Sequence, residues 1–150
     1  MNATSGAMPN TTPSFGQLAP PSSIFAEAGL TPFCDPVGRI AWAKADAPAA
    51  AAVLARNAYA IVRVELWCIC NEDTYSAVIP YVDGLYGRFD FRQVDVWSSE
   101  SESWDDYCVR CRDWALSRLP LLTYEPMLTL DYGPDKMRVH FAVRSQGDFE

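Results

Sequence analysis

Two pairs of cysteines are the side chains in this sequence whose spacing could support metal or redox chemistry. Cys68 and Cys70 are separated by one residue, and Cys108 and Cys111 by two. Four thiolates form a tetrahedral zinc site where such pairs meet. A redox-active Cys68–Cys70 dithiol is an alternative, because a thiolate at a helix start is stabilised by backbone N–H groups and the helix dipole. A single disulfide between the pairs, for instance Cys70 with Cys108, is a further alternative.

A structural role is the interpretation of these cysteines that their surroundings favour. Cysteine is among the most often buried residue types, even where it binds nothing. Successive same-face positions on a strand point in parallel, so a Cys68–Cys70 bridge would distort the backbone. Glu72 and Asp73 also disfavour a nearby thiolate. We therefore expect small buried thiols, no catalytic residue and no cofactor, with Cys34 as an unpaired thiol.

Other candidate chemistry is sparse. His140 is the only histidine, and it alternates outward on a predicted strand between Arg138 and Arg144. Because a lone histidine is more often a surface residue than a general base, we expect no catalysis from it. The acidic stretch over residues 100–106 suits the positive end of a helix and a solvated face.

Composition indicates one folded domain with protein partners. The 150 residues are 49% hydrophobic and 21% charged, and no apolar run reaches the ~20 residues of a membrane-spanning helix. A net charge of -7 argues against a nucleic-acid partner, whose phosphates attract Lys and Arg. Only Lys44 and Lys136 of the twelve cationic residues are lysines, and guanidinium groups suit fixed pairing with carboxylates at protein interfaces.

The chain divides near residue 45. Residues 1–44 are rich in Pro, Ser, Thr, Asn and Gly and show no sustained hydrophobic period. Isolated apolar side chains on an extended strap are what a chain needs to lie along a protein partner and fill its pockets. The predicted partner-binding residues of this strap are Phe15, Leu18, Ile24, Phe25, Phe33 and Trp42.

Residues 45–150 read as alternating helices and strands. The predicted elements are a helix over 46–57, a strand over 59–70, a helix over 71–87 kinked at Pro80, a strand over 88–97, a helix over 103–119, and a hairpin over 125–144 that turns at 133–135. Gly87 ends the second helix and Pro120 follows the third. This order predicts an α/β domain with a mixed sheet of about four strands and flanking helices.

Three apolar rows are predicted to form the core. One strand face carries Val62, Val64, Leu66, Cys68 and Cys70; one helix face carries Trp104, Cys108, Cys111 and Ala115; the last strand carries Met137, Val139, Phe141 and Val143. Packing the strand row against the helix row is the simplest way to bury both. The four thiols are then expected to lie near one another.

The order of elements over residues 58–145 resembles the thioredoxin-like fold. Trp67-Cys68 follows the first central strand, as the family's active-site Trp-Cys pair does. Asp95 in "VDV" corresponds to the acidic residue at the end of a strand in that family. Pro126 stands where the family has a cis proline before the hairpin. The single Ile69 between the cysteines departs from the family's two-residue spacer.

This resemblance implies a function without catalysis. Redox-inactive domains of this fold occur as accessory subunits of mitochondrial complexes, so the expectation is a structural subunit of a respiratory complex or mitochondrial ribosome, bound to other protein subunits. The alternatives are a thiol–disulfide oxidoreductase that uses Cys68 and Cys70, and a zinc-stabilised protein-binding module. A mitochondrial location is expected, with a cytoplasmic one as alternative, although the first cation, Arg39, comes too late for an arginine-rich presequence.

Overall fold

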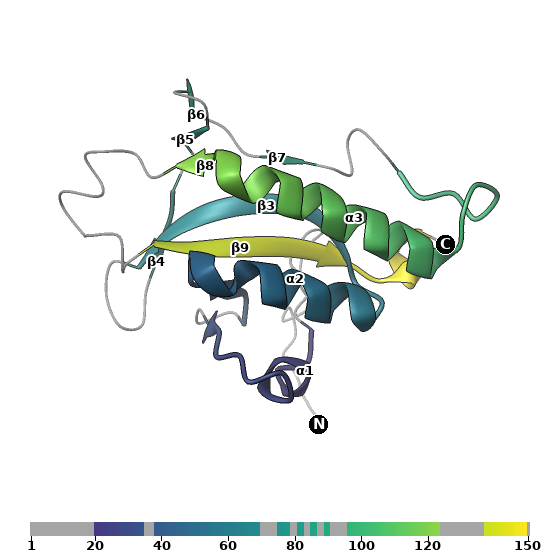
Figure 1. The fold of residues 1–150 in the computed structure, drawn as a ribbon, viewed down its shortest axis with the longest axis horizontal. Helices are drawn as coiled ribbons and strands as arrows, with labels where there is room; N and C mark the ends of the chain where they lie inside the picture. Colours follow the sequence, from purple (N-terminus) through teal and green to yellow (C-terminus); the bar gives the residue numbers. More distant parts are fainter. Residues whose placement is uncertain are drawn as a thin grey trace, which may run out of the picture.

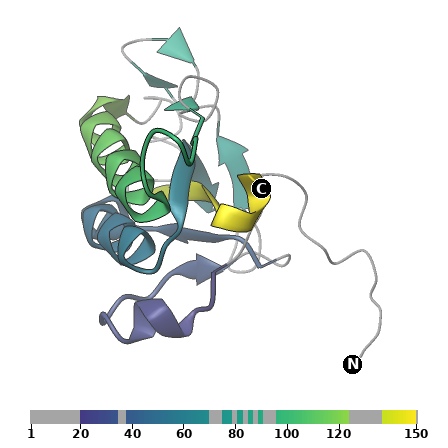
Figure 2. The ribbon, with the colours of Figure 1, turned by 90° about the vertical axis from the view of Figure 1, so that its right-hand side faces the viewer.

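The computed structural model describes residues 20–34, 38–69, 75–78, 81–82, 85–86, 89–90, 96–123 and 137–149. In these residues a β-sheet is covered on one face by two helices, as Figures 1 and 2 show from two directions. The helices are α1 (Ser23–Ala26), α2 (Ala47–Arg56) and α3 (Trp104–Arg118), with 3-10 turns η2 (Lys44–Asp46), η3 (Leu119–Leu121) and η5 (Gln146–Phe149). The α+β class predicted from the sequence is confirmed at this coarse level.

The main sheet is built on four strands in the order β2-β9-β3-β4. These are β2 (Ile40–Trp42), β9 (Met137–Arg144), β3 (Ala60–Ile69) and β4 (Tyr75–Val78); the short β1 (Phe33–Cys34) extends the β2 edge and β7 (Phe89–Asp90) also pairs with β3. A second sheet has the order β6-β5-β8, with β5 (Tyr81–Val82), β6 (Leu85–Tyr86) and β8 (Leu122–Thr123). Every strand pair formed by the described residues is antiparallel, so the expected mixture of parallel and antiparallel pairs is not found there.

Helices α2 and α3 form where the sequence predicts them. Alanine-rich α2 has high helix propensity and tolerates Pro48 in its first turn, where no intrahelical donor is needed. At the start of α3, the Ser103 hydroxyl accepts a hydrogen bond from the Asp106 N–H at 3.1 Å, which caps the helix. Asp105 and Asp106 in the first turn and Arg118 in the last complement the helix dipole.

A β-bulge in β3 changes which residues face the helices. Ile61 pairs with Val143, but Arg63 pairs with the next residue of β9, Ala142, so Val62 is the additional residue. The extra residue reverses the side-chain alternation, and Ile61 joins Val64 and Leu66 in the core under α2 and α3. The predicted apolar row was therefore wrong at its first member, since Ile61 takes the place assigned to Val62. The rows predicted on α3 and β9 are buried as expected.

The helix predicted over residues 71–87 is wrong. Within that range the described residues 75–78, 81–82 and 85–86 are strands β4, β5 and β6. Tyr and Val, which repeat at helical spacing there, have high strand propensity, and Pro80 cannot donate a helical hydrogen bond. Pairing of β4 with the end of β3, where Trp67 lies opposite Ala77, provides the competing backbone partner.

The strand and hairpin predicted on either side of α3 are only partly found. Of residues 88–97, 89–90 form β7 and 96–97 form no strand, whereas 88 and 91–95, which include Asp95, lie outside the described residues. The last strand, β9, is confirmed. Its described neighbours are β2 and β3, whereas β8 pairs with β5; the turn predicted at 133–135 and Pro126 also lie outside the described residues.

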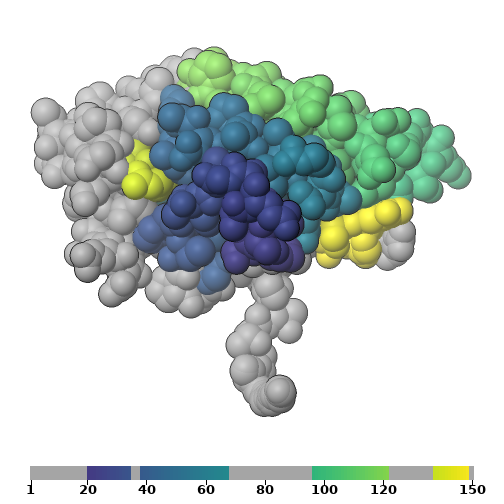
Figure 3. Space-filling model, turned by 60° about the horizontal axis from the view of Figure 1, so that its bottom comes forward, coloured from purple at the N-terminus to yellow at the C-terminus, as the bar shows by residue number. Residues whose placement is uncertain are grey.

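The segment before residue 45 is joined to the domain in its described part. Strand β2 pairs with β9, and Phe25 of α1 contacts Trp42 with ring centroids 4.5 Å apart inside the core. Figure 3 shows residues 20–34 lying against the surface formed by α2 and its neighbours. Residues 20–34 and 38–44 are therefore part of the fold, although the sequence predicted an extended strap up to residue 44.

Candidate functional sites

The face of the sheet opposite the helices carries a polar and aromatic cluster, which we call the Trp67–His140 cluster. The Trp67 and His140 rings are stacked, with centroids 4.3 Å apart and planes 17° from parallel. The Trp67 indole N–H donates a hydrogen bond to Glu65 Oε1 at 3.2 Å, and Arg63 Nε lies 3.0 Å from Glu65 Oε2. The guanidinium of Arg39 lies 5.3 Å from the centre of the Trp67 ring, on which it forms a cation–π contact.

His140 is buried in this cluster, which corrects the expectation of an outward surface residue. Its exposed fraction is 4%, and its Nδ1 lies 2.8 Å from the Ile40 carbonyl oxygen, to which it donates as the neutral Nδ1–H tautomer. Burial lowers the pKa of His140 to about 4, Arg39 and Arg63 act in the same direction, and the Ile40 hydrogen bond and Glu65 oppose them. The ring is therefore a neutral structural group at physiological pH.

Cys108 and Cys111 are buried free thiols in a second aromatic cluster. They pack with Trp104, Tyr107 and small residues at the end of α2 and the start of β3. Burial raises the pKa of both thiols to about 12; Asp105 adds to the shift at Cys108, whereas a Tyr107 hydrogen bond opposes it at Cys111. Burial also raises the pKa of Tyr107. Neither thiol is a nucleophile near neutral pH.

Cys108 and Cys111 lie far along the sheet from the backbone of Cys68. The Trp104 indole N–H donates to the Ala58 carbonyl at 2.9 Å, which fixes the start of α3 beside the residues that precede β3. Cys111 lies about 10 Å further along the helix, whereas Cys68 lies about 33 Å further along the strand. Zinc ligands lie only ~2.3 Å from the metal, so these backbone positions argue against one site for both pairs.

The structure bears in part on two other predictions for the cysteines, a metal site and a Cys70–Cys108 disulfide. Among the residues that the structure describes, no group of three or more His, Cys, Asp and Glu side chains is arranged to hold a metal ion. Because Cys108 is a free thiol, its predicted disulfide with Cys70 is not formed. The Cys68 side chain and all of Cys70 lie outside the described residues, and Cys34 is exposed and forms no disulfide.

A hollow of about 790 Å³ lies at the start of α3, and we call it the α3 hollow. Its walls come from the loop before the helix, the first helical turn and Gln146. The lining residues are Trp97, Ser98, Ser99, Glu100, Glu102, Ser103, Trp104, Asp105 and Gln146. The two indoles meet edge to face with centroids 5.1 Å apart, and the Trp97 N–H donates to the Glu102 carbonyl at 3.1 Å. The hollow therefore combines an ordered aromatic wall with an acidic rim.

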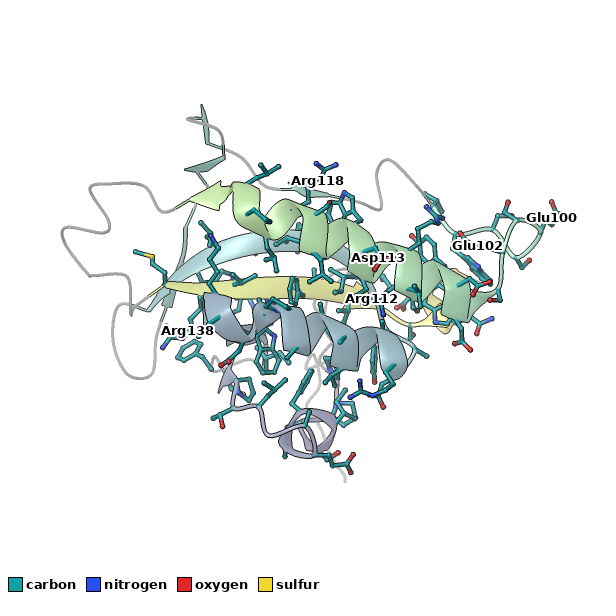
Figure 4. All side chains as sticks on the ribbon, viewed as in Figure 1. Glu100, Glu102, Arg112, Asp113, Arg118 and Arg138 are labelled. Atoms are coloured by element: carbon teal, nitrogen blue, oxygen red, sulfur yellow. The ribbon has the colours of Figure 1, made fainter. Side chains whose placement is uncertain are left out.

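The carboxylates of the α3 hollow differ in their partners. Glu102 forms an ion pair with Arg110, in which Arg110 Nε donates to Glu102 Oε2 at 3.2 Å. Glu100 and Asp105 are exposed and have no ion-pair partner among the residues described. Figure 4 shows Glu100 and Glu102 at one end of the molecule, away from Arg118 near its middle and from Arg138 toward the other end. Two carboxylates at this end are thus available to an external cation.

The predicted partner-binding residues of the N-terminal strap occupy different environments. Phe25 and Trp42 are 0% and 1% exposed in the chain's own core, so they offer no side-chain surface to a partner in this structure. Ile24 and Phe33 are half-buried, and Ile24 packs against the same core. Phe15 and Leu18 lie outside the described residues.

The sequence analysis did not identify the α3 hollow or the Trp67–His140 cluster as a candidate site. The acidic run over residues 100–106 was visible, but Gln146 enters the α3 hollow from a sequence-distant turn. Glu65 and His140 are Cα partners across β3 and β9, a relation that depends on the register after the bulge. The alternation of Arg63, Glu65 and Trp67 was the one sequence signal for the Trp67–His140 cluster.

Comparisons of the chain with protein-family models, with curated protein sequences and with solved structures found no match. Within the described parts of the chain, none of the helices combines the length and apolar character needed to cross a bilayer.

Proposed function

We propose that this chain is a non-catalytic subunit that binds another protein, and that a basic segment of the partner docks in the α3 hollow. One observation carries the proposal: Glu100 and Asp105 line the same hollow as the indoles of Trp97 and Trp104. Neither carboxylate has an ion-pair partner among the residues described. Carboxylates attract Arg and Lys, and an indole face adds a cation–π contact.

Two further properties support a cationic partner. The chain carries a net charge of -7, which accelerates the approach of a basic ligand. Val96, beside the hollow, is 59% exposed and offers an apolar contact next to the charged rim. Apolar and aromatic contacts surrounded by charge are typical of protein interfaces.

The wider setting of this proposal comes from the sequence. Three statements stay predictions. They are the resemblance to redox-inactive thioredoxin-like subunits, membership of a mitochondrial assembly, and the alternative of a cytoplasmic location. The thiol–disulfide oxidoreductase alternative stays one as well, because it depends on the Cys68 and Cys70 side chains. Reduction of insulin by the purified chain, lost in both Cys68→Ser and Cys70→Ser variants, would favour that alternative over a binding subunit.

A charge-paired peptide experiment tests the α3 hollow. The probe is a blocked tetra-arginine peptide, with a blocked tetra-glutamate peptide as the charge-reversed control, and binding is followed by calorimetry and by NMR shifts of the Trp indole N–H groups. We expect binding of the arginine peptide alone. Because each exposed ion pair contributes roughly 0.2–1 kcal/mol, the double variant Glu100→Gln/Asp105→Asn should bind about five-fold more weakly.

A matched variant separates the α3 hollow from the general negative charge. Glu27→Gln/Asp46→Asn also removes two exposed carboxylates, but neither lines the hollow. We expect it to bind the arginine peptide nearly as tightly as the wild type. Equal weakening by the two double variants, or shifts that spare the Trp97 and Trp104 N–H signals, would mean that the peptide does not dock here.

A further inference from the structure

Cys108 and Cys111 place two thiols on the same face of α3, one turn apart. Together with Trp104 and Tyr107 they form what we call the thiol cluster, and both cysteines are 0% exposed and free of disulfides. Residues three positions apart on a helix have Cβ atoms about 5–6 Å apart. The charge of a Cys108 thiolate would raise the pKa of Cys111, as expected for neighbouring sulfurs. The two sulfurs therefore form a close pair.

This spacing suits an ion held between the sulfurs better than a disulfide. A disulfide needs Cβ atoms ~3.8 Å apart, so it would require the middle of α3 to contract. A metal–thiolate bond is ~2.3 Å long in zinc sites, so one ion can join two sulfurs that are ~4–5 Å apart. Rotation of the two cysteine side chains provides that separation without a change in the helix.

The number of ligands indicates which class of ion fits. Structural zinc takes four ligands, whereas no third Cys, His, Asp or Glu side chain joins this pair among the residues that the structure describes. Soft thiolate ligands favour Cu(I), an ion that is stable with two thiolates in a line. The described surroundings of the pair therefore fit a two-coordinate, monovalent thiophilic ion rather than zinc.

The surroundings also provide partners for a negatively charged metal complex. Burial raises the pKa of both thiols, as does Asp105 at Cys108, but the Tyr107 hydroxyl and Arg110 lower the pKa of Cys111. The guanidinium of Arg110 lies 5.3 Å from the centre of the Tyr107 ring, so a positive charge stands beside the pair. A coordinated metal ion deprotonates a thiol outright, which overcomes the effect of burial.

Trp104 links the thiol cluster to the α3 hollow. Its indole packs in the cluster and also lines the hollow, whose rim carries Glu100 and Asp105. These carboxylates raise the local concentration of cations. An ion that reaches the thiols from the hollow passes Trp104, so the surroundings of this indole change on binding.

We propose that Cys108 and Cys111 bind one Cu(I) ion between their sulfurs. Each S–H proton is released to solvent and two Cu–S bonds form, so two neutral thiols and one monovalent cation become a complex with a single negative charge, without transfer of electrons. Opening of the buried cluster limits the rate, so uptake is slower than at an exposed thiol. The site does not depend on peptide docking, because neither thiol lines the α3 hollow.

Copper transfer to the full reduced chain tests the site. Cu(I) is supplied without oxygen as its coloured complex with bathocuproine disulfonate, and the loss of colour after overnight incubation measures uptake. The variant Cys34→Ser/Cys68→Ser/Cys70→Ser retains only the pair on α3, and we expect it to take up one equivalent. A further Cys108→Ser or Cys111→Ser substitution should abolish this uptake. No uptake by the folded triple variant, or uptake that the fourth substitution leaves unchanged, would overturn the proposal.

The wild-type chain provides a measurement that does not require any variant to fold. Cu(I) is diamagnetic, so NMR can follow the indole N–H signals, and copper should shift that of Trp104, which packs with the thiols. The Trp67 N–H, which donates to Glu65 on the opposite face of the sheet, is the control for binding elsewhere. The same concentration of Zn(II) should leave the Trp104 signal in place.

X-ray absorption of the copper-loaded triple variant counts the ligands, and we expect two sulfurs per copper. Three or more sulfurs, a Trp104 signal that copper does not move, or an equal shift of that signal by zinc would contradict a two-coordinate Cu(I) site at Cys108 and Cys111.

Discussion

The Trp104 indole N–H donates a hydrogen bond to the carbonyl of Ala58, a residue 46 positions earlier in the chain, at 2.9 Å. Ala58 lies in the turn between α2 and β3 and has a positive φ of 67°. One side chain thus fixes the start of α3 to a backbone conformation that an alanine rarely adopts. The same contact therefore helps to position the buried thiols Cys108 and Cys111 and one wall of the α3 hollow.

Replacing Trp104 with Phe should lower the free energy of unfolding by about 2 kcal/mol, because the Ala58 carbonyl loses its donor and the buried ring becomes smaller. Urea denaturation measures the loss. Trp97→Phe is the matched control, because its N–H bonds to the nearby Glu102 carbonyl; it should cost about 1 kcal/mol or less. Equal losses in both variants would contradict a special role for the long-range contact.

Replacing Ala58 with Gly should raise the free energy of unfolding by about 0.5–1 kcal/mol. A left-handed conformation costs an alanine roughly 1–2 kcal/mol, which exceeds the ~0.5–1 kcal/mol that glycine's greater freedom in the unfolded chain costs. Thermal and urea unfolding report the change. The same substitution at exposed Ala49, inside α2, should destabilise by about 1 kcal/mol, and a shift of the same sign at both positions would refute the strain at Ala58.

The described thiols should differ sharply in reactivity. Cys34 is exposed, whereas burial raises the pKa of Cys108 and Cys111 to about 12, so iodoacetamide at pH 8 should modify Cys34 within minutes and spare the other two. Peptide mass spectrometry locates the label. Modification of all three in denaturant provides the control, and rapid labelling of Cys108 or Cys111 in the native chain would show that the thiol cluster opens.

The stability of the whole fold should also depend on His140 at acidic pH. Its folded pKa of about 4 lies below the ordinary 6.5, so the full contribution is present above pH 6.5 and is lost as pH falls toward 4. Between pH 7.5 and 4.5 the wild type should lose about 2.5 kcal/mol more than His140→Asn in urea unfolding. The comparison cancels the carboxylates common to both chains, and parallel pH curves would assign the acid sensitivity to them.

The elements that the sequence predicted correctly are those whose signals are local. Ser103 followed by two aspartates gave the start of α3, and the alanine run gave α2. The segment over 71–87 failed because tyrosines and valines at helical spacing also satisfy a strand once β3 supplies a pairing partner. Propensity and period alone did not separate these two outcomes.

The candidate sites depended on contacts that no local pattern encodes. The burial of His140 requires β9 to lie between β2 and β3, and its pairing with Glu65 requires the bulge at Val62. The backbone of Cys68 lies far from Cys108 and Cys111 for a related reason. The contact of Trp104 with Ala58 sets the position of α3 along the sheet, and it leaves Cys111 near the start of β3 and Cys68 near its end.

The position of β9 has a kinetic consequence. The central pairing of the sheet joins residues 60–69 to residues 137–144, and β2 and β3 have no direct pairing with each other. A folding nucleus that uses this pairing must close a loop of some seventy residues, so folding should be slow for a domain of this size. Until β9 inserts, β2 and β3 each present an unpaired edge, and intermolecular strand pairing competes with folding during that interval.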